Sequence, residues 1–301
     1  MRKIEYKVSE EFNGTPLYYF LRECVGVSTR IIQTLRHTPE SVFINGSESR
    51  VVDKVKTDDE IVILLPEKTE APLLWETELA VIYEDEDLLI INKPSGVSVH
   101  PTKNHPNGTL CNAVAAYLKN HGNENFVARA VGRLDKVTSG VMVFAKNAFV
   151  ASRLNGNLDK TYIALAEGVL AGEGTVDAPI YRPDINKTIR AVGDQGDEAI
   201  TNWKALESFH NKTILKVKTV TGRTHQIRVH CAHIGHALVG DEMYGAKVTD
   251  NIKRTALHCY EVKIVHPITN EEKTFIAELP QDIKKELEKS GFSLDKGKGF
   301  C

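Results

Sequence analysis

The chain has 301 residues, of which 42% are hydrophobic and 26% charged, a composition typical of a globular protein. No stretch reaches the roughly 18 consecutive apolar residues that a membrane-spanning helix needs, and the first residues lack the apolar segment of a secretory signal. The 5 cysteines include no Cys-x-x-Cys pair, so neither a disulfide framework nor a zinc ribbon is indicated. The sequence therefore predicts a cytoplasmic protein with one large and one small domain and no membrane partner.

The net charge of -2 is unevenly distributed along the chain. Residues 67–90 carry 1 Lys or Arg against 8 Asp or Glu, whereas residues 91–270 carry 22 against 15 and 10 of the 11 histidines. A basic body behind an acidic segment is compatible with an anionic partner such as RNA. Enzymes that act on small anionic metabolites carry similar charge, so composition leaves that alternative open.

The first part of the chain predicts two helices, a hairpin and a strand. Thr15-Pro16 is typical of an N-cap followed by proline in the first helical position, and Ser28 is a good N-cap for a second helix. Asn45-Gly46 is a strong signal for a tight hairpin turn. The apolar run at residues 60–65 is expected to be the closing strand.

This pattern resembles the S-four-like RNA-binding domain, for which we expect residues 1–66. The resemblance is carried by the segment STR at residues 28–30, the VFINGS turn and the Asp-led strand DEIV at residues 59–62. It implies that Arg30, on the second helix, contacts RNA phosphates. The match is partial, because the glycine usual before the VxVNG strand is absent and Asp58 replaces a favoured glycine. A docking domain without RNA contact is the alternative.

Residues 67–78 are acidic, contain Pro72 and lack periodicity, so they are expected to form a linker. A second domain is expected over residues 79–301. Its short strands and helices alternate without a regular βαβ rhythm, which favours an α+β fold with a mixed, mostly antiparallel sheet.

A polar loop within residues 130–147 is the first candidate site. Asp135 is its only carboxylate, flanked by Arg133 and Lys136, and it precedes the apolar strand at residues 141–145. Nearby cations would keep this carboxylate ionised and available as a nucleophile or base. The alternative is an aspartate that caps the turn through backbone amides.

The segment 219–245 is the second candidate. A helix is expected from about residue 224 to 234, with Arg223 and Arg228 at and near its start, where an anion or phosphate could bind. Four histidines and a cysteine also raise the possibility of a metal site, but no familiar ligand spacing is completed. Histidines that pack an RNA-facing helix are the simpler account, and no metal is expected. The residues concerned are His225, His230, Cys231, His233 and His236.

The run KTYIALAEG at residues 160–168 is expected to be a strand with Tyr162, Ala164 and Ala166 on one face. Tyr162 is then either a core aromatic with a satisfied hydroxyl or a ring that stacks on a base. The residues alone favour the core position.

Taken together, these segments resemble the RluA-type family of RNA pseudouridine synthases. The resemblance covers about residues 79–280, and six matches in order make it specific. They are INKPSGVSVHP (91–101), GTLCNAV (108–114), GRLDKVTSGVMVFAKN (132–147), KTYIALAEG (160–168), TGRTHQIRVHCAHIGHALVGDEMYG (221–245) and LHCYEVKIVHP (257–267).

The resemblance implies a pseudouridine synthase fold and an isomerase that converts uridine to pseudouridine in structured RNA. It implies that Asp135 is the catalytic aspartate and that Arg228 pairs with it. Tyr162 is implied to stack on the target base and to help remove the proton from carbon 5. This isomerisation needs no redox change, group donor or energy source, so no cofactor is expected.

The resemblance also suggests residues for substrate binding. Arg133 is a candidate to fill the gap left by a flipped base, and Arg223 and Lys93 are candidates to contact the RNA backbone. Gly132 and Val137 depart from the family pattern, which has histidine and aspartate frequently at these positions.

By analogy, ribosomal RNA of the large subunit is a more probable partner than transfer RNA, and a monomer is expected. Two other functions stay open from the sequence. One is a catalytically silent RNA-binding or ribosome-assembly protein that has retained the fold. The other is a metal-dependent hydrolase that uses the histidines of residues 225–236.

Overall fold

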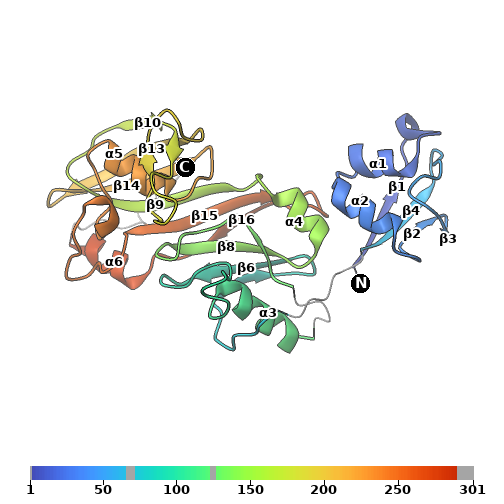
Figure 1. Cartoon of the computed structure of the whole chain (residues 1–301), viewed down its shortest axis with the longest axis horizontal. Coiled ribbons are helices and arrows are strands. Elements are labelled where there is room, and N and C mark those ends of the chain that lie inside the picture. Colours follow the sequence, from blue (N-terminus) through green and yellow to red (C-terminus); the bar gives the residue numbers. More distant parts are fainter. Residues whose placement is uncertain (1, 66–71, 123–126, 290–301) are drawn as a thin grey trace.

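The computed structural model describes residues 2–65, 72–122 and 127–289, and it divides them into a small N-terminal unit and a larger unit built on one long sheet (Figure 1). The N-terminal unit has a four-stranded antiparallel sheet in the order β1-β4-β2-β3. Its elements are β1 (Arg2–Lys7), a 3-10 turn (Glu10–Phe12), α1 (Leu17–Glu23), α2 (Thr29–Arg36), β2 (Val42–Ile44), β3 (Ser47–Glu48) and β4 (Glu60–Leu65).

The local signals in this unit are mostly confirmed. The Ser28 side chain accepts a hydrogen bond from the Ile31 amide at the start of α2. Asn45 and Gly46 both have positive φ, at 49° and 77°, as a tight turn between β2 and β3 requires. The predicted cap at Thr15 is wrong, because α1 begins after Pro16 and the Thr15 hydroxyl donates to the Phe12 carbonyl instead.

The larger unit is built on a ten-stranded sheet. Eight strands follow one another in the order β10-β13-β14-β9-β15-β8-β6-β5, while β16 pairs with β15 and β7 pairs with β8. Among the described strands of this sheet, β15 and β8 are the one parallel pair. The predicted α+β fold with a mixed, mostly antiparallel sheet is therefore confirmed. The first strands and helices are β5 (Val81–Glu84), β6 (Leu88–Lys93), α3 (Leu110–Asn120), β7 (Arg129–Val131), β8 (Ser139–Ala145), α4 (Ala148–Leu154) and β9 (Asp159–Glu167).

The second half of the unit completes the sheet and adds a small hairpin, β11-β12, beside it. In Figure 1, α5 and α6 lie toward the end of the sheet that is far from the N-terminal unit, whereas α4 lies toward that unit. The elements are β10 (Glu173–Asp177), β11 (Ile180–Tyr181), β12 (Ala191–Val192), β13 (Ile200–Phe209), β14 (Lys212–Thr219), α5 (Gln226–His233), a 3-10 turn (Glu242–Tyr244), β15 (Leu257–Val265), β16 (Glu272–Ile276) and α6 (Gln281–Glu288).

The central strands carry the core of this unit. All seven residues of β8 are buried, as are six consecutive residues of β9. Burial on both faces explains why β8 is a continuous apolar run and not an alternating one. A rigid sheet of this kind fixes the loops at its edges, and the candidate site lies on such loops.

Part of the predicted linker is packed against the larger unit. The Leu73 carbonyl accepts a hydrogen bond from the Asn112 side chain, and the Trp75 amide donates to the Asn112 carbonyl, near the start of α3. Residues 67–71 of the predicted linker lie outside the described residues. A second link joins the units directly, because Arg2 forms two 2.9 Å hydrogen bonds to the carboxylate of Asp87.

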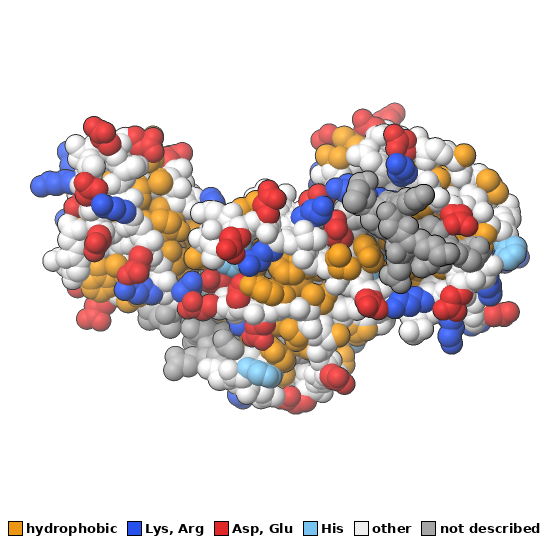
Figure 2. All heavy atoms as spheres, turned by 180° about the vertical axis from the view of Figure 1, so that it is seen from behind, with side chains coloured by type: hydrophobic (Ala, Val, Ile, Leu, Met, Phe, Trp, Pro, Cys, Tyr) orange, Lys and Arg blue, Asp and Glu red, His pale blue; other side chains and the backbone are white. Residues whose placement is uncertain are grey.

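No helix among the described residues is both long enough and apolar enough to cross a membrane. The surface of both units is mixed in charge on the face shown in Figure 2, where acidic and basic side chains alternate.

Candidate active site

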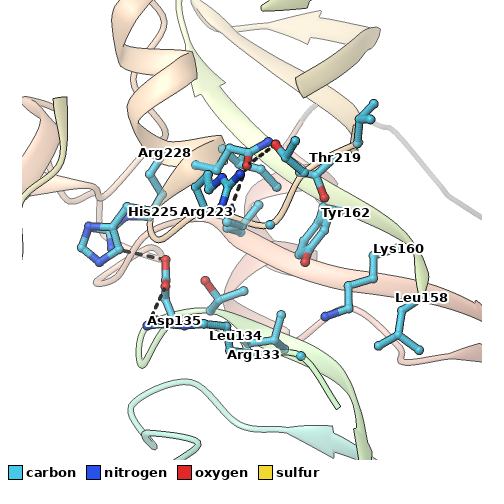
Figure 3. A pocket seen from close by; sticks show the side chains of 18 of the residues that line it. Arg133, Leu134, Asp135, Leu158, Lys160, Tyr162, Thr219, Arg223, His225 and Arg228 are labelled. Carbon is cyan, nitrogen blue, oxygen red and sulfur yellow. Dashed lines mark hydrogen bonds and ion pairs between the residues drawn. The ribbon is translucent and has the colours of Figure 1, made fainter. Parts of the chain in front are cut away.

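A cavity of about 350 Å³ lies where three segments of the larger unit meet: the loop between β7 and β8, strand β9, and the turn from β14 into α5 (Figure 3). Its volume is at the lower end of the range of about 300–1,000 Å³ for small-molecule sites. A cavity of this size suits one flipped nucleoside. All three segments were singled out from the sequence, and the fold brings them together.

The loop from Gly132 to Thr138 places Asp135 in this cavity. The Asp135 backbone carbonyl accepts a hydrogen bond from the Thr138 amide, which closes the turn, and the Asp135 side chain is 14% exposed. Among the described residues, no backbone amide donates to the Asp135 carboxylate. The turn-capping alternative is therefore not what the structure has, and the carboxylate faces the cavity.

Arg228 holds this carboxylate from α5. Its Nη1 lies 3.7 Å from Oδ2 of Asp135, and its other two nitrogens donate to Asp241 at 2.6 and 2.8 Å. Both partners of the shorter pair are buried, with side chains 6% and 1% exposed for Arg228 and Asp241. Burial lowers the pKa of Arg228, but hydrogen bonding and charge from Asp241, with the charge of Asp135, outweigh it and raise the pKa. A permanently charged guanidinium with a fixed orientation thus faces Asp135.

Asp241 was not identified from the sequence. It lies thirteen residues after Arg228, beyond the end of α5, and its carboxylate is fully committed to the guanidinium. One feature of the sequence points to Asp241: it is the first carboxylate after the helix that carries Arg228.

The start of α5 is set by His225, which has a left-handed backbone with φ 58°. The helix therefore begins at Gln226, two residues later than expected. Nδ1 of His225 lies 3.0 Å from the Tyr244 hydroxyl, and the Tyr244 ring lies 5.2 Å from the Arg228 guanidinium carbon. Burial lowers the pKa of His225, so its ring stays neutral near pH 7.

Tyr162 projects from β9 into the cavity (Figure 3). Its side chain is buried, at 7% exposure, beside the thiol of Cys259 on the neighbouring strand β15. Burial, with the charges of Cys259 and Asp135, raises the pKa of Tyr162 well above its usual value. The hydroxyl is therefore protonated at neutral pH, and the ring presents an apolar wall to a bound base.

The structure corrects the role that the sequence suggested for Lys93. The sequence interpretation placed it on the RNA backbone, but its side chain has no exposed surface. Its ammonium donates to the carbonyls of Pro94, Lys136 and Thr138, at 2.8, 3.3 and 2.8 Å. Lys93 therefore holds the loop that carries Asp135 in place through hydrogen bonds to backbone carbonyls. Burial lowers the pKa of this ammonium to about 7, with the charge of Arg254 acting in the same direction.

The two arginines at the cavity rim are exposed. Arg133 donates to the Thr224 hydroxyl at 3.2 Å and is 57% exposed, while its Nη2 lies 4.0 Å from Asp135. Arg223 donates to the Glu198 carbonyl at 2.9 Å and is 41% exposed. Both therefore keep free hydrogen-bond donors at the edge of the cavity. Arg30, on α2, is exposed in the other unit and does not line the cavity.

Histidines of residues 225–236 that were considered as metal ligands are hydrogen-bonded to protein groups. His230 is fully buried, and its two ring nitrogens lie 2.9 Å from the Thr201 hydroxyl and the Ala178 carbonyl. His236 is paired with the Glu167 carbonyl. Among the described residues, no group of three or more His, Cys, Asp or Glu side chains is placed to hold a metal ion. The packing role anticipated as the simpler account is what the structure shows.

Comparison with known proteins identifies the family to which the chain belongs. A model of the RNA pseudouridylate synthase family matches residues 87–233, which include Asp135, Tyr162 and Arg228. A Bacillus subtilis protein described as the uncharacterized RNA pseudouridine synthase YlyB is 34% identical over 96% of this chain and 98% of its own length. The chain belongs to the RNA pseudouridylate synthase family. It is an isomerase that converts uridine to pseudouridine in RNA, and the resemblance drawn from the sequence is confirmed.

Further relatives agree. The ribosomal large subunit pseudouridine synthase D of Haemophilus influenzae is 37% identical over 83% of this chain and 89% of its own length. The fold is also that of a human protein, RNA pseudouridylate synthase domain containing 4, with a TM-score of 0.57 and 23% identity over 69% of this chain and 92% of the other.

Proposed function

We propose that this isomerase acts on uridines of large-subunit ribosomal RNA, with Asp135 as the group that carries the chemistry. The observation that carries the proposal is the buried Arg228–Asp241 pair, which fixes a guanidinium 3.7 Å from the Asp135 carboxylate inside a nucleoside-sized cavity. The choice of ribosomal RNA is supported by the printed names of relatives from Haemophilus influenzae, Pseudomonas aeruginosa and Escherichia coli.

The arrangement suits a reaction in which the base leaves the ribose, rotates and rejoins through carbon 5. An ionised carboxylate is needed whether it attacks the ribose or the base, or instead takes a proton from ribose carbon 2. Arg228 serves both routes, because its fixed guanidinium lies 3.7 Å from Oδ2 of Asp135 and orients the carboxylate without closing the side that faces the cavity.

The target nucleotide must leave its helix to reach Asp135, which costs about a few kcal/mol. Stacking on the Tyr162 ring would offset roughly 1–3 kcal/mol of that. Because the Tyr162 hydroxyl is held protonated, we assign this residue chiefly to stacking, and its implied part in proton removal at carbon 5 would require deprotonation that the site disfavours. Arg133 would enter the vacated space in the RNA, and Arg223 would hold the backbone at the rim.

The N-terminal unit is proposed to be the S-four-like RNA-binding domain that the sequence resembles, over residues 1–66, followed by the linker and the catalytic domain. The two helices beside a four-stranded sheet support this proposal. Arg30 is exposed on α2 and free to meet a phosphate. We also propose that the protein works as a monomer in the cytoplasm.

The test is a map of pseudouridines in large-subunit ribosomal RNA and in transfer RNA from a strain that lacks the gene. Loss of defined sites from ribosomal RNA, restored by the wild-type gene, is expected. Loss confined to transfer RNA would refute the choice of substrate. An unchanged map would favour the alternative of a silent RNA-binding or ribosome-assembly protein.

A further inference from the structure

Lys160 is a cavity residue to which neither the sequence analysis nor the proposed function assigns a role. It precedes Tyr162 by two residues on β9, so both side chains leave the same face of the strand. Figure 3 shows both projecting toward the cavity, with Asp135 on the opposite side. An ammonium group thus shares the cavity with the ring and the carboxylate.

The Lys160 ammonium has no protein partner among the described residues. Two other lysines of this unit have protein partners: Lys93 donates to three carbonyls, and Lys218 donates to both oxygens of Asp159. The Lys160 side chain is partly buried in the cavity wall, and this burial lowers the pKa of its ammonium. A desolvated cation without an acceptor is costly, so a ligand that brings an acceptor is favoured.

Gly132 provides the room for this ammonium. A Cβ atom at Gly132 would lie 3.0 Å from Nζ of Lys160, closer than most contacts of that kind. Gly132 also has a φ of 70°, in the left-handed region that glycine adopts without strain. Gly132 therefore lies directly beside both the loop that carries Asp135 and the Lys160 ammonium.

Charge develops in this cavity during the reaction. When the bond between ribose C1′ and uracil N1 breaks, its electron pair leaves with the base, and the negative charge spreads over N1, O2 and O4. The base then rotates, C5 bonds to C1′, the C5 proton is lost and N1 gains a proton, so that atoms and electrons balance without a co-reactant. A cation that meets the anion in a desolvated site stabilises the transition state more than the neutral base.

We propose that Lys160 donates a hydrogen bond to a carbonyl oxygen of the flipped uracil and stabilises the uracil anion formed when the C1′–N1 bond breaks. This inference rests on the proposed function in one respect, namely that the target uridine occupies the cavity beside Asp135. It makes Lys160 a catalytic residue that acts on the leaving base, whereas Asp135 and Arg228 act from the other side of the cavity.

The first test compares Lys160→Met with the wild type in single-turnover tritium release from C5-labelled RNA. The rate should fall about 100-fold, the effect of removing one preorganised donor, with the RNA dissociation constant and the melting temperature unchanged. The matched control is Lys263→Met, which removes an exposed lysine from the neighbouring strand β15 and should leave the rate unchanged.

The second test uses RNA with 5-fluorouridine at the target, whose fluorine makes the base a better leaving group. Cleavage of its C1′–N1 bond is measured as the disappearance of the N-linked nucleoside from a digest of the RNA. The Lys160→Met rate should then be only about 10-fold below the wild type, because the anion needs less help. Arginine stays charged to higher pH than lysine, so Lys160→Arg should recover part of the rate. The pH above which the rate declines should then be higher for Lys160→Arg than for the wild type.

Three results would overturn the inference. An equal loss with uridine and 5-fluorouridine would show that Lys160 does not act on the leaving base. Lys160→Met could instead bind RNA with a larger dissociation constant and a smaller salt dependence while its single-turnover rate stays unchanged. That result would make Lys160 a phosphate contact. A lowered melting temperature with equal loss in Lys160→Arg would make it structural. Failure of the proposed function is distinct, since the wild type itself would then be inactive on the RNA.

Discussion

The ion pair behind Asp135 and an ion pair of the N-terminal unit differ in burial. The Arg228–Asp241 pair is 6% and 1% exposed, whereas the Lys7–Asp58 pair of the N-terminal unit is 67% and 74% exposed. A buried charge must be paired or it destabilises the fold, while an exposed pair contributes little. The difference separates two uses of charge: the buried Arg228–Asp241 pair fixes a guanidinium beside Asp135, whereas the Lys7–Asp58 pair lies at the surface, within reach of a partner.

The largest effect on stability is expected for Asp241→Asn, which removes the buried charge that opposes Arg228. Stability should fall by about 3 kcal/mol and activity by about 100-fold, because Arg228 is left underpaired and Asp135 loses its fixed neighbour. Urea unfolding and tritium release measure the two effects. Asp58→Asn is the matched control in the exposed pair and should change neither the stability nor the activity. Equal effects of Asp241→Asn and Asp58→Asn would contradict the distinction between buried and exposed pairs.

Lys93→Met should have the next largest effect. Three carbonyls would lose their donor, so the loop that carries Asp135 should loosen, with stability lower by about 2–3 kcal/mol and activity by about 10-fold. Activity and stability equal to the wild type would show that the loop does not need this brace.

The pH dependence of Lys93 sharpens the same prediction. The pKa of Lys93 is lowered to about 7 in the folded chain, whereas an exposed lysine in the unfolded chain has a pKa of 10.5. Between these values the unfolded state holds more protons, so the stability of the wild type relative to Lys93→Met should rise with pH. Urea unfolding of both proteins at pH 7 and pH 9 measures this, and a falling difference would contradict the account.

Arg133→Ala and Arg223→Ala should act on affinity alone. Both side chains are exposed at the cavity rim, so each loss should weaken RNA binding roughly 5- to 10-fold, reduce the salt dependence by about one ion and leave stability unchanged. Binding titrations at several salt concentrations test this. An unchanged salt slope would place these arginines away from the RNA.

Arg30→Ala should have the smallest effect. Because Arg30 is exposed in the other unit, its loss should weaken RNA binding only about 2- to 3-fold, with the single-turnover rate at saturating RNA unchanged. An RNA-binding titration of Arg30→Ala and of the wild type under the same conditions measures this difference in affinity. An unchanged affinity would favour the alternative in which the N-terminal unit docks without touching RNA.

Local signals allowed much of the fold to be predicted from the sequence. The Asn45-Gly46 turn, the cap at Ser28 and the strand at residues 60–65 each depend on neighbouring residues, and each is found. The start of α5 was misplaced because His225 has a left-handed backbone, which is uncommon for a residue other than glycine and is not indicated by its neighbours in the sequence.

The candidate site shows where such inference stops. Asp135, Tyr162 and Arg228 lie in segments with recognisable motifs, and the fold brings them to one cavity. Lys93 was misassigned because a lysine after a strand is usually exposed, and only the three buried carbonyls make its burial possible. Asp241 was missed because a pairing across thirteen residues has no local pattern.

The central claim is that the Asp135 carboxylate performs the chemistry in a cavity built to hold a base. Asp135→Asn tests it most directly, because the amide keeps the size and removes the charge. RNA binding equal to the wild type, with tritium release from C5 reduced at least about 1,000-fold, is the result predicted. Tritium release close to that of the wild type would contradict the claim, and so would loss of RNA binding in proportion to loss of activity.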